Sequence, residues 1–435
     1  MRSKSIIAAA IATAAALVLG ACASPAADAG KDKEIVLWHM EGTPNRVAAF
    51  EALAQKYNDT DPEYMVKVQV QAWDQVYTKI AAAAQSGKQP DMLFAIPDFA
   101  TYVRGLGLGQ TVTDVVDSLD GEYGLIDAAK VPYQDDGEYW GVPLYGMVQM
   151  LWYRKDMFQA AGLDAPTTWS ELKDDAQALT KDGTSGIALP AGKNLATDQV
   201  LYSLMVTGGA ANFFTKDGTV NLDTPQAAAA FDLYKDLLQY SPADSGSYAW
   251  GEPQAAFNSG AAAMAIEKGQ YLAPFAEESG QDPSQLGCAP IPVADDGGTP
   301  GSIYYSNGAM VLSEDEAKQQ ASGTFLKWLM EPDNYGDFLN AEPGLFLPVT
   351  SDGANLEQWR SNETVTTYAD CVDAMLKQAE TGQLFGFVDG QYIDSIGEIS
   401  GQNFLAQAIQ EMYVNGMSAK EATAWAQDKM QAAIS

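Results

Sequence analysis

The sequence predicts an α/β fold with two lobes, and three observations support this prediction. Short apolar runs typical of buried strands alternate with amphipathic helical segments along most of the chain. The 435 residues are enough for two domains by length. Apolar residues make up 47% of the chain and aromatic residues 10%, a composition that supports well-packed cores.

The first block of the chain alternates strands with helices. Residues 33–39 are predicted to form a buried strand, and residues 45–57 carry apolar side chains at helical spacing. A second strand at 66–70, a helix at 76–84 and a third buried strand at 92–96 follow. This order implies a parallel sheet with right-handed crossovers.

A second block repeats the alternation with different residues. The sequence contains no tandem repeats. Strands are predicted at 186–190 and 263–266, and helices at 168–180, 195–207, 225–240, 255–262, 317–330 and 418–433. The chain therefore divides into two α/β blocks.

The N-terminal residues have the pattern of an export signal. Arg2 and Lys4 precede an apolar run over residues 6–19, which is too short and too rich in alanine for a membrane span. The run ends at residues 19–22 (LGAC), which resemble a lipobox. We predict a lipoprotein signal peptide over residues 1–21, with an ordinary signal peptide as the alternative.

Cys22 is accordingly the predicted lipidation site and the first residue of the mature protein. Residues 22–33 are small or polar, cannot bury apolar surface, and are predicted to form a flexible tether. The covalent lipid would attach the protein to the membrane at the cell surface.

The charge and motif content exclude several function classes. A net charge of −32 argues against nucleic acid and polyanionic ligands. The chain has one histidine and no GxSxG, HExxH or Walker-type motif, so we expect a protein that is not an enzyme. The enzymatic alternative is a secreted glycoside hydrolase, because two carboxylates suffice for that chemistry.

The cysteines predict no metal centre. Neither a CxxC motif nor a Cys/His cluster is present, and we expect no metal and no cofactor. Cys288 and Cys371 remain once Cys22 is lipidated, and in an oxidising compartment they are a possible disulfide pair. Two separately buried thiols are the alternative.

Six short motifs occur in order along the chain. They are residues 86–91 (SGKQPD), 141–145 (GVPLY), 151–158 (LWYRKDMF), 161–172 (AGLDAPTTWSEL), 257–264 (FNSGAAAM) and 289–292 (APIP). Together these motifs resemble one known family, the extracellular solute-binding proteins of carbohydrate ABC importers (family 1), which includes maltose-binding protein. Arg154 departs from the asparagine usual at its position in the family.

This resemblance implies a two-lobed periplasmic-binding-protein-like (type II) fold with a hinge and a ligand cleft between the lobes. It assigns residues 34–147 and 294–343 to lobe 1, and residues 148–293 and 344–435 to lobe 2. The implied function is capture of a neutral oligosaccharide, with two to four sugar units favoured, by lobe closure. The implied partners are the permease subunits of an ABC transporter, and a monomer is expected.

A neutral sugar requires polar groups around its ring edge and flat aromatic side chains against its faces. Asp98 occupies the position of a family aspartate that bonds sugar hydroxyls, and Tyr271 that of a stacking tryptophan. For each candidate, a purely structural role is the alternative. The predicted ligand-binding residues are His39, Glu41, Trp73, Asp98, Tyr145, Trp250, Tyr271 and Asn307.

Two further alternatives remain open at this point. Within the same family, the ligand can be a polyol or another small polar solute. The acidic candidate site disfavours a phosphate-bearing ligand, which would require arginine and helix N-termini. A surface adhesin would typically contain repeats or β-rich modules, and the sequence has no repeats.

Overall fold

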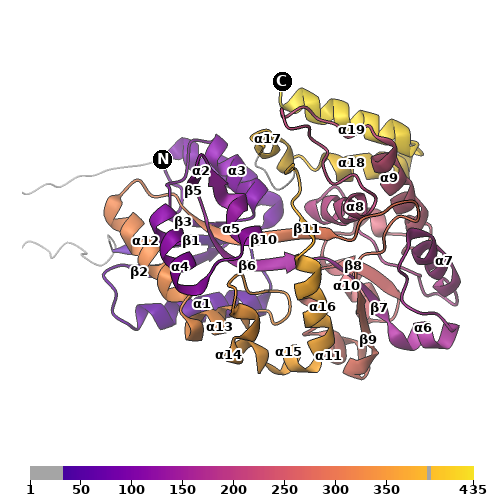
Figure 1. Ribbon diagram of the computed structural model, residues 1–435, viewed down its shortest axis with the longest axis horizontal. Coiled ribbons are helices and arrows are strands. Elements are labelled where there is room, and N and C mark those ends of the chain that lie inside the picture. Colours follow the sequence, from indigo (N-terminus) through magenta and orange to yellow (C-terminus); the bar gives the residue numbers. More distant parts are fainter. Residues whose placement is uncertain (1–32, 389–392) are drawn as a thin grey trace, which may run out of the picture.

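The computed structural model describes residues 33–388 and 393–435 (Figure 1). The predicted signal peptide, the lipidation site Cys22 and all but the last residue of the predicted tether lie outside this part of the chain. No helix in the described part combines the length and the apolar character that a membrane span requires.

The first lobe is built around a six-stranded mixed sheet with strand order β11-β10-β3-β1-β2, in which β6 pairs with β10. Strand β1 is parallel to β2 and β3, as the sequence predicts, whereas β10 is antiparallel to β3 and β6. The strands are β1 (Glu34–His39), β2 (Met65–Val70), β3 (Met92–Ala95), β6 (Val142–Val148), β10 (Ser302–Val311) and β11 (Gly382–Gln383).

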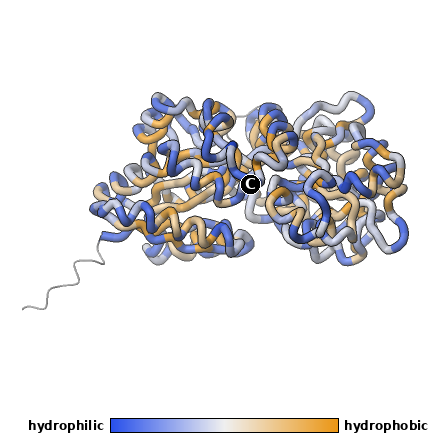
Figure 2. Tube along the Cα trace, turned by 90° about the horizontal axis from the view of Figure 1, so that it is seen from below, coloured by the Kyte–Doolittle hydropathy of each residue, from blue (hydrophilic) through white to orange (hydrophobic). Residues whose placement is uncertain are grey.

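The second lobe is built around a three-stranded antiparallel sheet, β8 (Met264–Glu267), β7 (Met150–Arg154) and β9 (Leu286–Ala289). Helices α8 (Leu195–Thr207), α9 (Pro225–Leu238), α18 (Phe404–Asn415) and α19 (Ala419–Ala433) pack against one another in this lobe. The two lobes lie side by side, with apolar segments inside each (Figure 2).

Helix ends follow local sequence signals. Thr168 with Glu171, and Ser418 with Glu421, form capping boxes at the starts of α7 (Trp169–Leu179) and α19.

The remaining α-helices and β-strands are α1 (Pro44–Asn58), α2 (Trp73–Ser86), α3 (Pro97–Gly105), α4 (Thr113–Tyr123), α5 (Asp127–Lys130), β4 (Gln134–Asp135), β5 (Glu138–Tyr139), α6 (Lys155–Ala161), α10 (Gly251–Asn258), α11 (Phe275–Ser279), α12 (Glu316–Leu329), α13 (Pro332–Leu339), α14 (Glu357–Arg360), α15 (Glu363–Thr367), α16 (Ala369–Ala379) and α17 (Ile396–Ser400).

One predicted strand, at residues 186–190, is not a strand in the structure. Its backbone N–H groups donate hydrogen bonds to three separate segments. Gly186 donates to the Thr180 hydroxyl, Ile187 to the Tyr240 carbonyl and Ala188 to the Met264 carbonyl. A continuous ladder therefore does not form, and only isolated bridges connect the segment to the neighbourhood of β8.

The chain passes between the lobes at Gln149, which separates β6 from β7. Some contacts in the structure join segments that the predicted boundaries assign to different lobes. Helix α14, which they assign to lobe 2, packs against α13, and Thr350 forms a bridge with Leu125 of the first lobe. Helix α17 packs against α3 of the first lobe.

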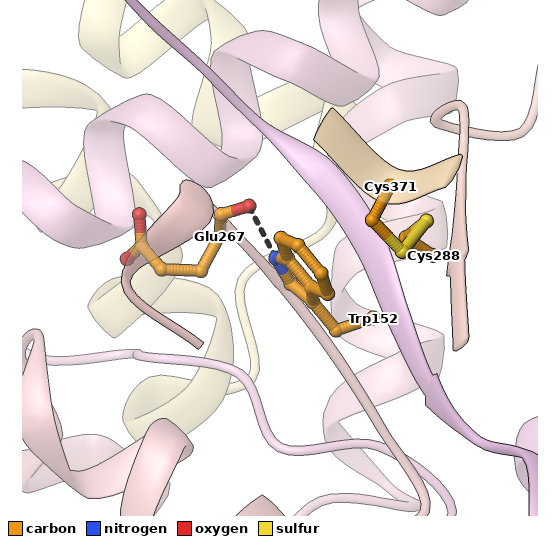
Figure 3. Close-up of a disulfide and its surroundings, with 4 residues drawn as sticks. All are labelled: Trp152, Glu267, Cys288 and Cys371. Carbon is orange, nitrogen blue, oxygen red and sulfur yellow. Dashed lines mark hydrogen bonds between the residues drawn. A yellow bond between two sulfur atoms is a disulfide. The ribbon is translucent and has the colours of Figure 1, made fainter. Parts of the chain in front are cut away.

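Cys288 of β9 and Cys371 of α16 form a disulfide (Figure 3). Cys288 pairs in register with Trp152 on β7, and the Trp152 indole donates a hydrogen bond of 2.8 Å to the carbonyl oxygen of Glu267. Helix α16 also contacts β6 and β10 of the first sheet. The disulfide thus joins the second sheet to a helix that touches both lobes.

Candidate functional site

A cavity of about 320 Å³ lies between the two lobes. Its first-lobe wall includes the segments that follow β1 and β3, where parallel strands of α/β proteins present ligand sites. Its second-lobe wall comes from the N-terminal ends of α8 and α10 and the turn after β8. The lining residues are Met40, Glu41, Gly42, Thr43, Arg46, Trp73, Ile96, Met147, Leu195, Gln199, Trp250, Gly251, Gln254, Lys268, Gln270, Tyr305 and Leu345.

Glu41 is the acidic residue of the first-lobe wall, and it is 5% exposed. One carboxylate oxygen accepts a hydrogen bond from the Tyr145 hydroxyl at 2.8 Å, and the other accepts from the Arg46 guanidinium at 2.9 Å. Arg46 also donates to Glu342 at 3.1 Å. Neighbouring protein groups therefore hold the Glu41 carboxylate in one orientation at the cavity surface.

Lys268 is the basic residue of the second-lobe wall. Its ammonium donates to Gln199 Oε1 at 2.6 Å and to Glu267 Oε1 at 3.0 Å, and it lies 4.3 Å from the centre of the Trp250 ring. Burial lowers the pKa of Lys268, and the carboxylates of Glu267 and Glu41 oppose that shift. An ammonium has three N–H donors, so one remains for an oxygen in the cavity.

Two half-buried indoles, Trp73 and Trp250, give the cavity flat apolar faces, one from each lobe. Tyr305 and Gln270 also line the cavity. The Tyr305 hydroxyl and Gln270 Oε1 are buried and have no hydrogen-bond partner among the described residues, so a ligand hydroxyl that reached either atom would satisfy it.

The charges of the cavity wall are balanced by the protein itself. Glu41, Arg46 and Lys268 are the charged residues among the lining side chains, and each forms a salt bridge with a protein group. No group of three or more metal-ligating side chains occurs in residues 33–388 and 393–435. The arrangement therefore suits binding of a neutral polar molecule.

The structure brings four of the eight predicted ligand residues together. Glu41, Trp73 and Trp250 line the cavity, and Tyr145 lies behind it as the hydrogen-bond donor to Glu41. The other four do not line it, and each has a structural environment that explains its position.

His39 and Asn307 are buried within the first lobe. The His39 ring packs 4.6 Å from the Phe50 ring, and burial lowers the pKa of His39 to about 4, although the nearby Glu41 charge opposes the shift. Asn307 lies in β10, 2% exposed, opposite Tyr145 in the ladder. Both side chains point into protein.

Tyr271 and Asp98 are also fully buried. The Tyr271 ring stacks on Trp152 with a centroid distance of 5.5 Å and also packs against Phe257, so its faces are covered. Asp98 follows β3 as the sequence predicts, but its carboxylate accepts a hydrogen bond from the Ser400 hydroxyl of α17. Neither side chain is available to a molecule in the cavity.

Arg46, Gln199 and Lys268 line the cavity but were not among the residues predicted from the sequence. Only Lys268 lay close to a predicted ligand-binding residue, because it precedes Tyr271 by three positions. The chain turns through a short 3₁₀ segment, Gly269–Tyr271, which directs Tyr271 inward and leaves Gln270 at the cavity. Arg46 and Gln199 lie on helices whose orientation depends on the tertiary fold.

Comparison with known proteins shows the family of the chain. A family model described as bacterial extracellular solute-binding protein matches residues 42–336. YcjN of Escherichia coli, named as an ABC transporter periplasmic-binding protein, is 26% identical over 387 residues, 87% of this chain and 88% of that protein.

Solved structures share the fold at low sequence identity. T. maritima MalE3 with bound maltose has a TM-score of 0.79 at 14% identity and covers 92% of this chain and 99% of its own. A solute-binding protein from Agrobacterium radiobacter K84 in complex with ribitol has a TM-score of 0.77 at 23% identity, with 92% and 98% coverage.

Proposed function

The chain belongs to the bacterial extracellular solute-binding proteins, and we propose that it captures a neutral sugar in the cleft between its lobes for delivery to an ABC transporter permease. Members of this family are binding proteins of ABC importers rather than enzymes. The observation that supports a neutral ligand is the charge balance of the cavity wall, where each charged side chain is already paired within the protein.

The chemistry of the wall supports a sugar. Trp73 and Trp250 supply flat faces for the C–H surfaces of a ring, and Glu41 and Lys268 supply an acceptor and a donor from opposite lobes. A ligand with several hydroxyls can offer a donor to Glu41 and an acceptor to Lys268. Binding would therefore favour the arrangement in which both lobes contact the ligand.

The cavity volume favours the short end of the predicted ligand range. Ligand pockets usually measure about 300–1,000 Å³, and the 320 Å³ here is near the lower limit. A disaccharide is thus our first choice among neutral oligosaccharides. A polyol is the second candidate, because Glu41 and Lys268 would also bond an open-chain diol and one solved structure of the same fold is a complex with ribitol.

Calorimetric titration of the purified protein tests this proposal. The panel should contain neutral mono-, di- and trisaccharides, linear polyols and a glycerol phosphodiester. We expect saturable binding of at least one neutral sugar and none of the phosphodiester. Binding of the phosphodiester alone would overturn the neutral-sugar assignment.

The lipid anchor is a separate part of the proposal. We propose that Cys22 is lipidated and that the protein is held at the outer face of the cytoplasmic membrane, with residues 22–33 as a tether. Cys22→Ala should release the protein from the membrane fraction and leave ligand affinity unchanged. Retention of that variant in washed membranes would reject the lipid anchor.

A further inference from the structure

Helix α17 is seated closely on the first lobe, next to α3 (Figure 1). Two glycines make this approach possible. A Cβ atom at Gly397 would lie 3.0 Å from the backbone nitrogen of Tyr102, and one at Gly401 would lie 2.8 Å from the Tyr77 ring. A larger residue at Gly397 would move α17 away from α3, and one at Gly401, directly after α17, would press against Tyr77 of α2.

Ser400 connects α17 to the first lobe by hydrogen bonds. Its hydroxyl donates to Asp98 Oδ2, and its oxygen lies 2.5 Å from the Tyr77 hydroxyl. Because the single Ser400 proton goes to Asp98, Tyr77 is the donor in the second bond. Asp98 is 0% exposed and Ser400 is 2% exposed, so loss of this contact would leave a buried carboxylate without its side-chain partner.

Helix α17 is also connected to the second lobe. It contacts α19, and Ser395, just before it, lies close to Gly218 in the turn that precedes α9. After α17, the backbone N–H of Ala406 at the start of α18 donates to Asp198 of α8 at 2.6 Å. Helix α17 is therefore a short element that leads directly into the second lobe and contacts the first lobe.

Neither Ser400 nor Asp98 lines the cavity. A ligand between Glu41 and Lys268 would leave the contact between α17 and α3 in place. The contact is thus compatible with an occupied cleft and adds to the interactions that hold the lobes together.

We propose that α17 is a latch that stabilises the closed arrangement of the lobes through Ser400 and Asp98 and that separates from α3 when the cleft opens. This proposal rests on the lobe closure of the proposed function. It makes the latch, as well as the ligand, a determinant of how long the cleft stays closed.

Distance measurements between the lobes test the latch without any ligand. Spin labels on Glu51→Cys of α1 and Asp174→Cys of α7, both exposed positions, report lobe separation in a full chain that also carries Cys22→Ser. Ser400→Ala should raise the ratio of open to closed molecules about tenfold, as expected for lost hydrogen bonds to a buried carboxylate. Gly397→Val should have a similar effect by displacing α17.

Gly121→Val is the matched control, because Gly121 lies in helix α4 with no atom within 4 Å of its Cβ position. It should give the wild-type distance distribution. The latch is rejected if Ser400→Ala and Gly397→Val also give that distribution, or if hydrogen exchange shows that α17 stays on α3 in open molecules. The distances are measured without ligand, so they do not depend on whether any sugar binds. The latch and the proposed sugar capture can therefore be rejected independently.

A kinetic arm uses the sugar that calorimetry identifies. If the latch holds the cleft closed, Ser400→Ala should release that sugar faster, by a factor similar to the change in the open-to-closed ratio. An unchanged dissociation rate in a variant whose lobes have opened would contradict the role of the latch in ligand retention.

Discussion

The hydroxyl of Tyr145 donates a hydrogen bond of 2.8 Å to the carboxylate of Glu41. Tyr145 lies on β6, four residues before Gln149, where the chain passes between the lobes, and Glu41 lies at the cavity. A buried side chain next to the interlobe crossing therefore orients the acidic group that we propose binds the ligand. Tyr145 itself does not touch the cavity.

Tyr145→Phe should weaken sugar binding about three- to tenfold, because the Glu41 carboxylate loses one of the two groups that fix its orientation. The measurement is calorimetric affinity together with thermal unfolding. Tyr335→Phe is the matched control: the buried Tyr335 hydroxyl bonds the Leu144 carbonyl and the Val349 N–H, and it is not among the cavity residues. Equal affinity losses in both variants would contradict a specific role for Tyr145.

Trp250→Ala and Tyr271→Ala should have opposite consequences. Trp250 is a half-buried face of the cavity, and its loss should reduce affinity about tenfold or more with a small change in stability. Tyr271 is buried against Trp152, and its loss should lower the free energy of unfolding by about 3–5 kcal/mol. Affinity titrations and urea denaturation of both variants measure these two effects. A loss of affinity in Tyr271→Ala together with a loss of stability in Trp250→Ala would indicate that Tyr271 is the stacking residue.

Two buried aspartates should make stability fall as pH rises. Burial raises the pKa of Asp98 to about 6 and that of Asp198 to about 8, from an ordinary value of 3.8. A raised pKa means that the folded protein holds the proton more tightly than the unfolded chain. The resulting stability is fully present below about pH 4 and is lost as pH rises through 6 and 8.

Asp198→Asn should therefore flatten the decline in unfolding free energy between pH 6 and pH 8, measured by denaturant titration. His39, whose pKa is lowered, makes stability rise with pH, but this contribution is the same in variant and wild type and cancels in their difference. The exposed Asp174→Asn is the control. If the unfolding free energy of the Asp198→Asn variant declines as steeply as that of the wild type between pH 6 and pH 8, Asp198 is not the group that releases the proton.

The disulfide should affect stability more than binding. Cys288 and Cys371 are 83 residues apart in sequence, and neither lines the cavity. The paired replacement Cys288→Ser and Cys371→Ser should lower the free energy of unfolding by roughly 2–5 kcal/mol, while ligand affinity changes less than twofold. A large loss of affinity in molecules that are still folded would show that α16 controls the cleft.

Much of the fold was predictable because it depends on local patterns. The alternation of 33–39, 45–57, 66–70 and 92–96 predicts the parallel strands β1, β2 and β3 with their connecting helices, and the structure confirms that pattern. Strand β10, at residues 302–311, was not predicted. It is buried on both faces, so its sequence lacks the alternation that identifies a half-exposed strand.

The site was predictable in part for a related reason. Residues that directly follow strands, such as Glu41, have positions that the parallel sheet determines. Tyr271 depends on the path of a 3₁₀ turn, and Asp98 depends on a contact with Ser400, 302 residues away in sequence. Spacing in the sequence does not report such long-range contacts, so these two residues could not be placed from the sequence.

The most direct test of the account is the affinity of two variants for the sugar selected by calorimetry. Glu41→Gln alters the acceptor on the first lobe, and Lys268→Met removes the donor on the second. We predict that each variant loses about tenfold or more in affinity, because in the proposed function both lobes bond to the same ligand in the cleft. Wild-type affinity in both variants, or no binding of any sugar by the wild-type protein, would contradict the central claim.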